Sequence, residues 1–145
     1  LSMYLTKRIK GKELLTFIPA QILGCLLGVM LANVFFEHSI IELSTKNRDG
    51  FHIFLSEIVA TFGLIFIIFA TLKDGKTTVA ACVATYISAG YWFTSSTSFA
   101  NPAVAIARTF TDSFTGINYL NTPTYIFAEL LGAIVAIYII KRLIK

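Results

Sequence analysis

The residues whose types and spacing could support chemistry lie in one segment of the sequence, Thr94 to Gly116, which reads TSSTSFANPAVAIARTFTDSFTG. Asn101 is a favourable residue for capping the start of a helix. Pro102 suits the first helical position, where no backbone N–H is needed. We therefore predict a helix from Pro102 to about Ser113. Its roughly 12 residues would extend about 18 Å, which is only about half the thickness of a bilayer.

A half-length helix between two apolar segments indicates a re-entrant element, whose non-helical approach must be buried in protein or line a watery cavity. The carbonyl groups of that approach, Ser95 to Ala100, would offer hydrogen-bond acceptors to a passing solute, and the amide of Asn101 would offer donors. The positive end of the helix dipole would lie at mid-membrane and repel cations and protons. The alternative is a plain surface turn, because Asn-Pro is common in turns.

Ionisable side chains within apolar segments are costly and usually functional. Glu57, in the sequence SEIVATFG, lies a few residues inside such a segment and could also extend to the membrane interface; Glu129 is similar in kind. His38 and His52 have no cysteine or carboxylate at ligand spacing, so each is expected to be a solvated loop residue. We predict no catalytic residues, no metal site and no cofactor.

The composition indicates a membrane protein. Of the 145 residues, 56% are hydrophobic and only 14% are charged, whereas a soluble domain is about 25% charged. The net charge of +4 is carried by short basic clusters between apolar runs, which is typical of membrane loops rather than of a nucleic-acid-binding face. Cys25 and Cys82 both lie inside apolar runs, so a disulfide framework is not expected.

Four segments have the length and apolar character to cross a bilayer. Their approximate ranges are Leu14 to Phe36, Phe54 to Leu72, Thr78 to Phe93 and Pro123 to Ile140. The third is short and fairly polar, as expected of a segment that leads into a re-entrant loop.

The distribution of lysine and arginine predicts the orientation, because cytoplasmic loops favour these residues. The connections on one side hold Lys7, Arg8, Lys10, Lys12, Lys73, Lys76, Lys141, Arg142 and Lys145, and those on the other hold Lys46, Arg48 and Arg108. We therefore expect the C-terminus to be cytoplasmic and the protein to lie in the plasma (inner) membrane.

Two segments form an internal repeat at an offset of 108 residues. Residues 16–32 read TFIPAQILGCLLGVMLA and residues 124–140 read TYIFAELLGAIVAIYII, with Gln21 aligned to Glu129 and Gly24 aligned to Gly132. The two copies are expected to cross the membrane in opposite directions, and inverted repeats place a functional site near the midplane. If the second repeated unit runs from about Phe54 to Leu143, most of the first unit is missing. Because of this, and because the chain does not begin with methionine, we expect an N-terminally truncated chain.

The Asn101-Pro102-Ala103 motif, the membrane glutamate Glu57 and the A-Q-x-x-G pattern of residues 20–24 together resemble the major intrinsic proteins, or aquaporins. The resemblance covers essentially the whole chain, residues 1–145. It implies an all-α membrane protein, an aquaporin-like helical bundle in which four spans and one re-entrant half-helix are present of an expected six and two. It also implies a homotetramer, and a role for Glu57 in holding the loop before Asn101 open to the pore.

The sequence departs from the family pattern at Val104, where typical members have an arginine that narrows the outer filter. Arg108 lies one helical turn later and shares the same face, and Ser98 matches another filter position. A filter without arginine at position 104 should be wider and less polar. The Asn-Pro-Ala-Val sequence resembles a bacterial aquaporin branch associated with arsenic resistance, which implies neutral metalloid acids as possible cargo beside water and glycerol-like polyols.

Three functions remain open on the sequence. The first is a passive channel for small neutral solutes, with the lipid bilayer as its surroundings and Asn101, Pro102, Ala103, Val104, Ser98 and Arg108 at the pore. The second is an intramembrane enzyme, which needs two convergent titratable groups or a metal site, and no spacing in the sequence indicates either. The third is a non-conducting remnant that only assembles with other membrane subunits.

Overall fold

The computed structural model describes residues 1–143, and every regular element in that range is a helix. Lys145, which the charge argument counted, lies outside the described residues. The helices are, in chain order, α1 (Ser2–Leu5), α2 (Gly11–Phe35), α3 (Phe51–Thr71), the 3₁₀ helix η1 (Leu72–Asp74), α4 (Lys76–Phe93), α5 (Pro102–Ala107), the 3₁₀ helix η2 (Arg108–Phe110) and α6 (Thr122–Leu143).

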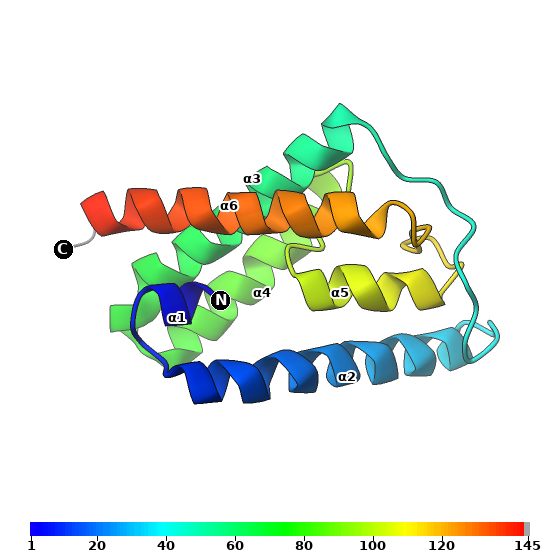
Figure 1. Cartoon of the computed structure of the whole chain (residues 1–145), viewed down its shortest axis with the longest axis horizontal. Helices are drawn as coiled ribbons and strands as arrows, with labels where there is room; N and C mark the ends of the chain where they lie inside the picture. The colour runs from blue at the N-terminus through cyan, green and yellow to red at the C-terminus, as the bar shows by residue number, and fades with distance from the viewer. Residues whose placement is uncertain (144–145) are drawn as a thin grey trace.

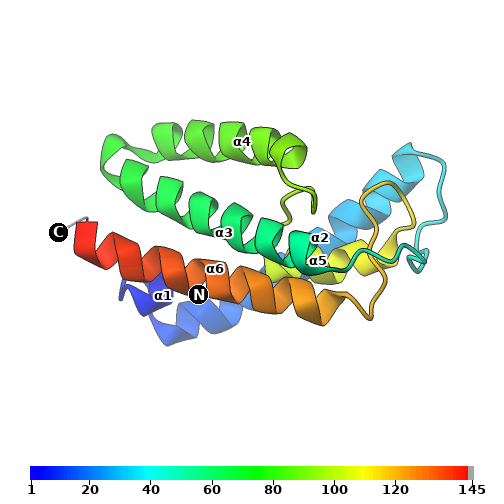
Figure 2. The same ribbon diagram turned by 90° about the horizontal axis from the view of Figure 1, so that it is seen from above.

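The short helix α5 lies between two long helices, α2 and α6, and contacts both (Figure 1). The two long helices run in opposite directions, as the inverted repeat predicted. α3 packs along α6, and α4 runs back beside α3 on the side away from α6 (Figure 2). The start of α5 therefore lies midway along the bundle, and its end lies near the connection that joins α2 to α3.

The predicted spans agree with the long helices to within a few residues at each end. Three of the described helices are long and apolar enough to cross a membrane: α2, α3 extended by η1, and α6. The remaining predicted span, α4, has 18 residues but falls short of the apolar character of the others because of its Thr, Ser, Gly and Tyr content. That α4 also crosses the membrane stays a prediction; it runs beside α3 (Figure 2).

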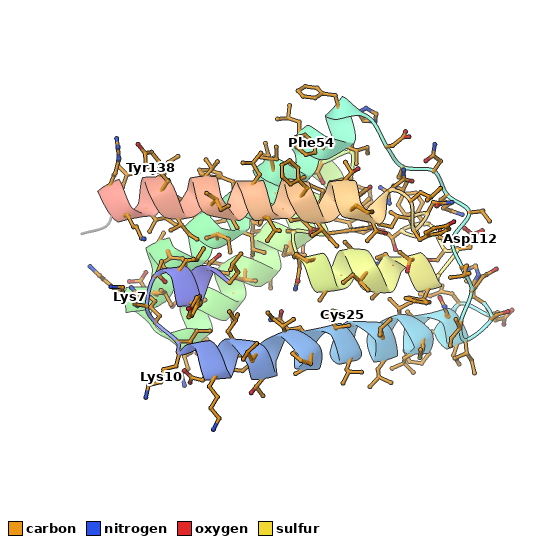
Figure 3. The ribbon with its side chains drawn as sticks, in the orientation of Figure 1. Lys7, Lys10, Cys25, Phe54, Asp112 and Tyr138 are labelled. Atoms are coloured by element: carbon orange, nitrogen blue, oxygen red, sulfur yellow. The ribbon has the colours of Figure 1, made fainter. Side chains whose placement is uncertain are left out.

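The basic clusters gather at one end of the bundle. Lys7 and Lys10 lie at this end, near the last turns of α6, whereas Asp112 lies at the opposite end (Figure 3). Arg142 stacks on Tyr138 in the last turns of α6, with its guanidinium carbon 4.3 Å from the ring centroid. The structure thus places the N-terminal and C-terminal basic clusters together, as the loop-charge pattern requires.

The core lies between α3 and α6, which pack more extensively than any other pair of helices. Small residues make this close contact possible: Ala60, Ala128 and Ala136 are completely buried. At Gly132 an added Cβ would lie 2.5 Å from the carbonyl oxygen of Ile58. Small residues at such an interface let two helix backbones approach closely, and this contact fixes α6 on α3.

The half-helix is shorter than predicted. We expected it to continue to about Ser113, but α5 and η2 end at Phe110, after six and three residues. Donors from elsewhere in the fold take its last carbonyl groups. The N–H of Ile117 bonds Arg108 O at 3.1 Å, and the N–H of Ser44 bonds Thr109 O at 3.0 Å. With these carbonyls occupied, no further helical turn can form, and the chain is extended at Thr111.

The contact at Gly132 predicts a large effect from a single methyl group. Gly132→Ala would push a Cβ against the α3 backbone, which cannot rotate away, so we expect the free energy of unfolding to fall by about 1–3 kcal/mol. Denaturant titration in detergent micelles measures it. The matched control is Gly11→Ala, whose methyl would meet only Tyr4 Cε2, at an ordinary 3.6 Å. Equal stability of the two variants would contradict the proposed close packing.

Candidate functional site

The segment before Asn101 is held by two buried glutamates. Glu57 of α3 accepts the backbone N–H of Phe99 through Oε1 at 2.9 Å and that of Ala100 through Oε2 at 2.8 Å. Glu129 of α6 accepts the N–H of Asn101 at 3.2 Å. The predicted contact between Glu57 and this loop is therefore present, and Glu57 is fully buried rather than extended to the membrane interface. Three consecutive donors thus point toward carboxylates.

The same segment has an unusual backbone. Thr97, Ser98 and Ala100 have φ angles of 66°, 54° and 51°, in the left-handed region that residues with a side chain rarely adopt. Each such residue costs about 1–2 kcal/mol unless surrounding contacts compensate. Charge-assisted hydrogen bonds to carboxylates are among the stronger contacts a backbone amide can make. The two glutamates therefore supply a physical reason for this conformation.

The carbonyl groups of the segment remain available. Within residues 1–143, no hydrogen bond is found to the carbonyl oxygens of residues 97–100, whereas that of Ser95 accepts from Arg48 Nη2 at 3.3 Å. A buried carbonyl without a partner is costly and needs water or another donor. Free acceptors next to N–H groups that are fully engaged suit a path for hydroxylated or water-like solutes.

Asn101 caps α5 as predicted. Its backbone is extended, and its Oδ1 accepts the N–H of Ala103 at 3.0 Å, while Pro102 occupies the first helical position. Because Oδ1 faces the helix, the two N–H donors of the side-chain amide are directed elsewhere. The donor role expected of Asn101 fits this geometry.

The sequence did not show that two carboxylates converge. Glu57 and Glu129, 72 positions apart in the sequence, bind adjacent residues of one loop, and both side chains are buried. Three of their four oxygens accept backbone N–H groups, whereas Oε2 of Glu129 is buried without a partner among the described residues. This arrangement holds the loop in place; within residues 1–143, no group of three potential metal ligands accompanies it.

Val104 and Arg108 share one face of the half-helix, as their spacing predicted. Both line a cavity of about 210 Å³ against α2, whose wall includes Cys25, Gly28 and Val29. The α2 residues in the wall opposite Val104 have small, mostly apolar side chains. With valine at this position, the first turn of α5 carries an apolar side chain in place of a cation.

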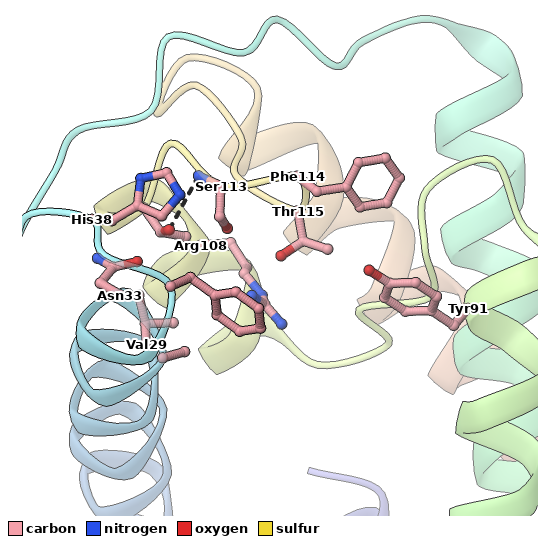
Figure 4. Close-up of a pocket in the computed structure, with 11 residues that line it drawn as sticks. Val29, Asn33, His38, Tyr91, Arg108, Ser113, Phe114 and Thr115 are labelled. Carbon is pink, nitrogen blue, oxygen red and sulfur yellow. Dashed lines mark hydrogen bonds between the residues drawn. The ribbon is translucent and has the colours of Figure 1, made fainter.

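Arg108 also reaches a second cavity, of about 450 Å³, at the end of the half-helix. Figure 4 shows its side chain directed into the space between α2, which carries Val29, and Tyr91 of α4. Tyr91 and Phe114 form an aromatic pair on the far side, with ring centroids 6.4 Å apart. We call this cavity the outer vestibule; its lining residues include no carboxylate.

Ser98 lies against α4 and lines none of these cavities. It is 4% exposed, and its hydroxyl is buried without a hydrogen-bond partner among the described residues. Gly90 makes room for it, since a Cβ there would lie 2.7 Å from Ser98 Oγ. Its proposed place in the filter stays a prediction.

The connection from α2 to α3 crosses the end of the half-helix. Asp112 accepts the N–H of Thr45 at 2.9 Å and the hydroxyl of Ser44 at 3.2 Å, and Lys46 Nζ lies 3.6 Å from its carboxylate. The Thr45 N–H, together with the nearby Lys46 charge, lowers the pKa of Asp112 below its ordinary value. His38, expected to be a solvated loop residue, instead lines the vestibule, with Nδ1 2.9 Å from Glu42 Oε2.

Sequence reasoning missed two further residues near the vestibule. Arg48, on the connection, and Phe99, before the half-helix, are 51 positions apart but meet with the Arg48 guanidinium carbon 5.8 Å from the ring centroid. Neither belongs to a recognisable spacing pattern. Only the hydrophobic character of Phe99 amid the Ser and Thr residues of its segment hinted at a special place.

Replacing one oxygen of Glu57 with an NH₂ group tests its hold on the loop. In Glu57→Gln one of the two N–H groups, of Phe99 or Ala100, would lose its acceptor, at a cost of roughly 1–3 kcal/mol. We expect faster hydrogen exchange at these two amides. Glu13→Gln, an exposed change in the first turn of α2, is the control. A Glu57→Gln protein in which both amides stay as protected as in wild type would refute this role.

The Asp112 contact should depend on pH. Because folding lowers the pKa of this carboxyl, its contribution to stability is complete above the unfolded value of about 3.9 and is lost as the pH falls through the lower, folded value. The amide NMR signal of Thr45 should therefore shift in acid, below about pH 4. Asp112→Asn should abolish this shift, and Asp49→Asn should leave it. Persistence of the shift in Asp112→Asn would assign it to another group.

Comparison with known proteins adds to this geometry. The chain is 41% identical over 141 residues to the aquaglyceroporin AqpS of Rhizobium meliloti (strain 1021). The alignment covers 97% of this chain and 60% of that relative, so the chain spans about three fifths of the relative's length. No family model matches the sequence, and no solved structure matches it.

The alignment to this relative extends over nearly the whole chain. It agrees with an all-helical architecture in which a short re-entrant helix begins at Asn101-Pro102-Ala103 between long apolar helices. The chain is therefore that of an integral, multi-pass membrane protein, and its sequence resembles the major intrinsic protein, or aquaporin, family.

Proposed function

We propose that this chain forms part of a passive channel for small uncharged solutes. The observation that carries the proposal is the loop before Asn101. Glu57 and Glu129 accept the N–H groups of Phe99, Ala100 and Asn101, while the carbonyl oxygens of residues 97–100 have no hydrogen-bond partner among the described residues. A solute that loses its water on entering needs such acceptors, together with donors like the Asn101 amide. The relative's name, aquaglyceroporin, supports the same class of function.

The proposed solutes include molecules larger than water. Val104 puts an apolar side chain where the family resemblance implies an arginine, and the neighbouring wall of α2 is lined by Gly28 and Val29. Such a wall accommodates the carbon backbone of a polyol while the loop carbonyls bind its hydroxyl groups. Water, glycerol-like polyols and neutral metalloid acids of the arsenite type are the cargo we infer, since all are uncharged and hydroxylated.

The exposed face of α2 supports the proposal that further helices, equivalent to those around α6, complete the pore. Glu129, Gly132 and Ala136 of α6 are buried against α3, yet their repeat counterparts Gln21, Gly24 and Gly28 are exposed. Apart from the chain neighbours and the backbone of α2 itself, a Cβ added at Gly24 or Gly28 would have no atom of the described residues within 4 Å. A helix pair like α3 and α4 would cover this face and complete the pore. We further propose a homotetramer in the plasma membrane, with the C-terminal basic cluster cytoplasmic.

Two other functions have less support. A non-conducting remnant would have no need of the strained loop and its two buried carboxylates. An enzyme would need two convergent titratable groups that a substrate can reach, but the two carboxylates that converge, Glu57 and Glu129, are 0% and 1% exposed, and three of their four oxygens accept backbone amides. The favoured function is therefore the channel.

Restoring an arginine at position 104 tests the proposed cargo. In a channel reconstituted into vesicles, Val104→Arg should cut the flux of glycerol and arsenite more than that of water, because the new side chain narrows the path and adds donors that order a file of water. Stopped-flow swelling measures water and glycerol, and uptake measures arsenite.

Val104→Ile, which keeps an apolar side chain, is the matched control and should leave the flux ratios unchanged. Equal losses for all three solutes in Val104→Arg would mean that another residue sets the filter. A wild-type channel permeable to water alone would likewise mean that a residue other than Val104 sets the filter.

A further inference from the structure

Two arginines from distant parts of the chain approach one aromatic ring. The guanidinium carbon of Arg108, on η2, lies 5.9 Å from the ring centroid of Phe99, and that of Arg48, on the connection between α2 and α3, lies 5.8 Å from it. A guanidinium within about 6 Å of a ring centroid is attracted by the negative face of the ring. Tyr125 packs on the same ring at 5.1 Å and helps to fix it.

Neither arginine has a carboxylate partner among residues 1–143. The ion pairs found there join His38 to Glu42 and Lys46 to Asp112. Arg48 is further held by its bond to Ser95 O, and its Nη1 is buried without a hydrogen-bond partner among the described residues. The two positive charges are thus held near one ring with nothing opposite in sign to neutralise them.

Arg108 is the member of the pair that reaches the solute path. It lines both the apolar cavity beside Val104 and the outer vestibule, and its side chain points toward the centre of the vestibule (Figure 4). The rings of Tyr91 and Phe114 line the vestibule as well, and so do those of Phe36 and His38. One helical turn, about 5.4 Å, separates it from the level of Val104.

We propose that Arg108, held on Phe99 together with Arg48, is the charged filter of this channel, displaced one helical turn outward from the Asn-Pro-Ala motif. This inference rests on the proposed channel function. Phe99 and Arg48 are positioning residues, and Arg108 faces the solute. The displaced charge rejects cations at the mouth, while the apolar section at Val104 stays wide enough for hydroxylated solutes.

The charge and the size of the side chain can be separated experimentally. In channels reconstituted into vesicles, Arg108→Gln removes the charge and keeps a polar side chain. Loss of a fixed charge in a partly dehydrated mouth should raise the leak of K⁺ roughly tenfold, with water flux little changed. Arg108→Lys keeps the charge and should retain cation rejection. Arg142→Gln, which removes another ring-stacked arginine at the opposite end of the bundle, is the control.

The positioning role has its own readout. Phe99→Leu keeps an apolar side chain but removes the ring, so it should raise the K⁺ leak in the same direction as Arg108→Gln. It should also abolish the ring-current shifts of both guanidinium NMR signals, a measurement that needs no transport. Arg48→Gln should raise the leak by a smaller factor, because Arg108 remains.

Three results would count against this assignment. A K⁺ leak in Arg108→Gln equal to that of wild type, in a channel that still passes glycerol, would overturn the displaced filter and leave the channel function standing. Guanidinium signals that keep their wild-type chemical shifts in Phe99→Leu would overturn the role of the ring. Absence of any solute flux through the wild-type protein would overturn the proposed function itself, and the filter with it.

Discussion

The rest of the structure depends on the bonding of three consecutive backbone N–H groups to buried carboxylates. The amides of Phe99, Ala100 and Asn101 bind Glu57 and Glu129, which lie on α3 and α6. A buried carboxylate needs hydrogen-bond donors, and a backbone in the left-handed region needs contacts that offset its strain. The same hydrogen bonds meet both needs. Because of this exchange, non-helical backbone can lie inside an apolar bundle.

The close packing of α3 on α6 is what brings the two carboxylates together. Gly132 and the buried alanines set the distance between the helix backbones, so that side chains from both helices reach one loop. At the other end of the half-helix, tertiary donors take the last carbonyls and Asp112 binds the connection to α3. The half-helix is thus fixed at both ends, which leaves its Val104 and Arg108 face directed at α2 and the vestibule.

In the channel that we propose, selectivity would follow from the position of positive charge on that face. Valine at position 104 leaves an apolar section beside the Asn-Pro-Ala motif, and Arg108, one turn further along, lines the same cavity. Stacking on Phe99 holds Arg108 with no carboxylate partner among the described residues; a carboxylate would attract the cations that the proposed mouth must reject. Separate apolar and charged levels would let hydroxylated solutes pass and still exclude ions.

The sequence by itself determined the apolar helices, the basic end of the bundle, the Asn101 cap and the importance of Glu57, because these depend on local composition, capping chemistry and the cost of charge in a membrane. It also indicated that Val104 and Arg108 share a face, since helical periodicity is local. It overestimated the length of the half-helix, because the donors that end it come from Ser44 and Ile117 rather than from neighbouring residues.

Only the tertiary structure decided the contacts that span long separations. Glu129 meets Asn101 across 28 positions and Glu57 meets Ala100 across 43, and Arg48 joins Arg108 on the ring of Phe99. Such contacts are set by helix packing distances and loop paths, and no spacing along the chain encodes them. The position of Arg108, the proposed filter charge, therefore became apparent only once α3, α6 and the connection before α3 were placed around the half-helix.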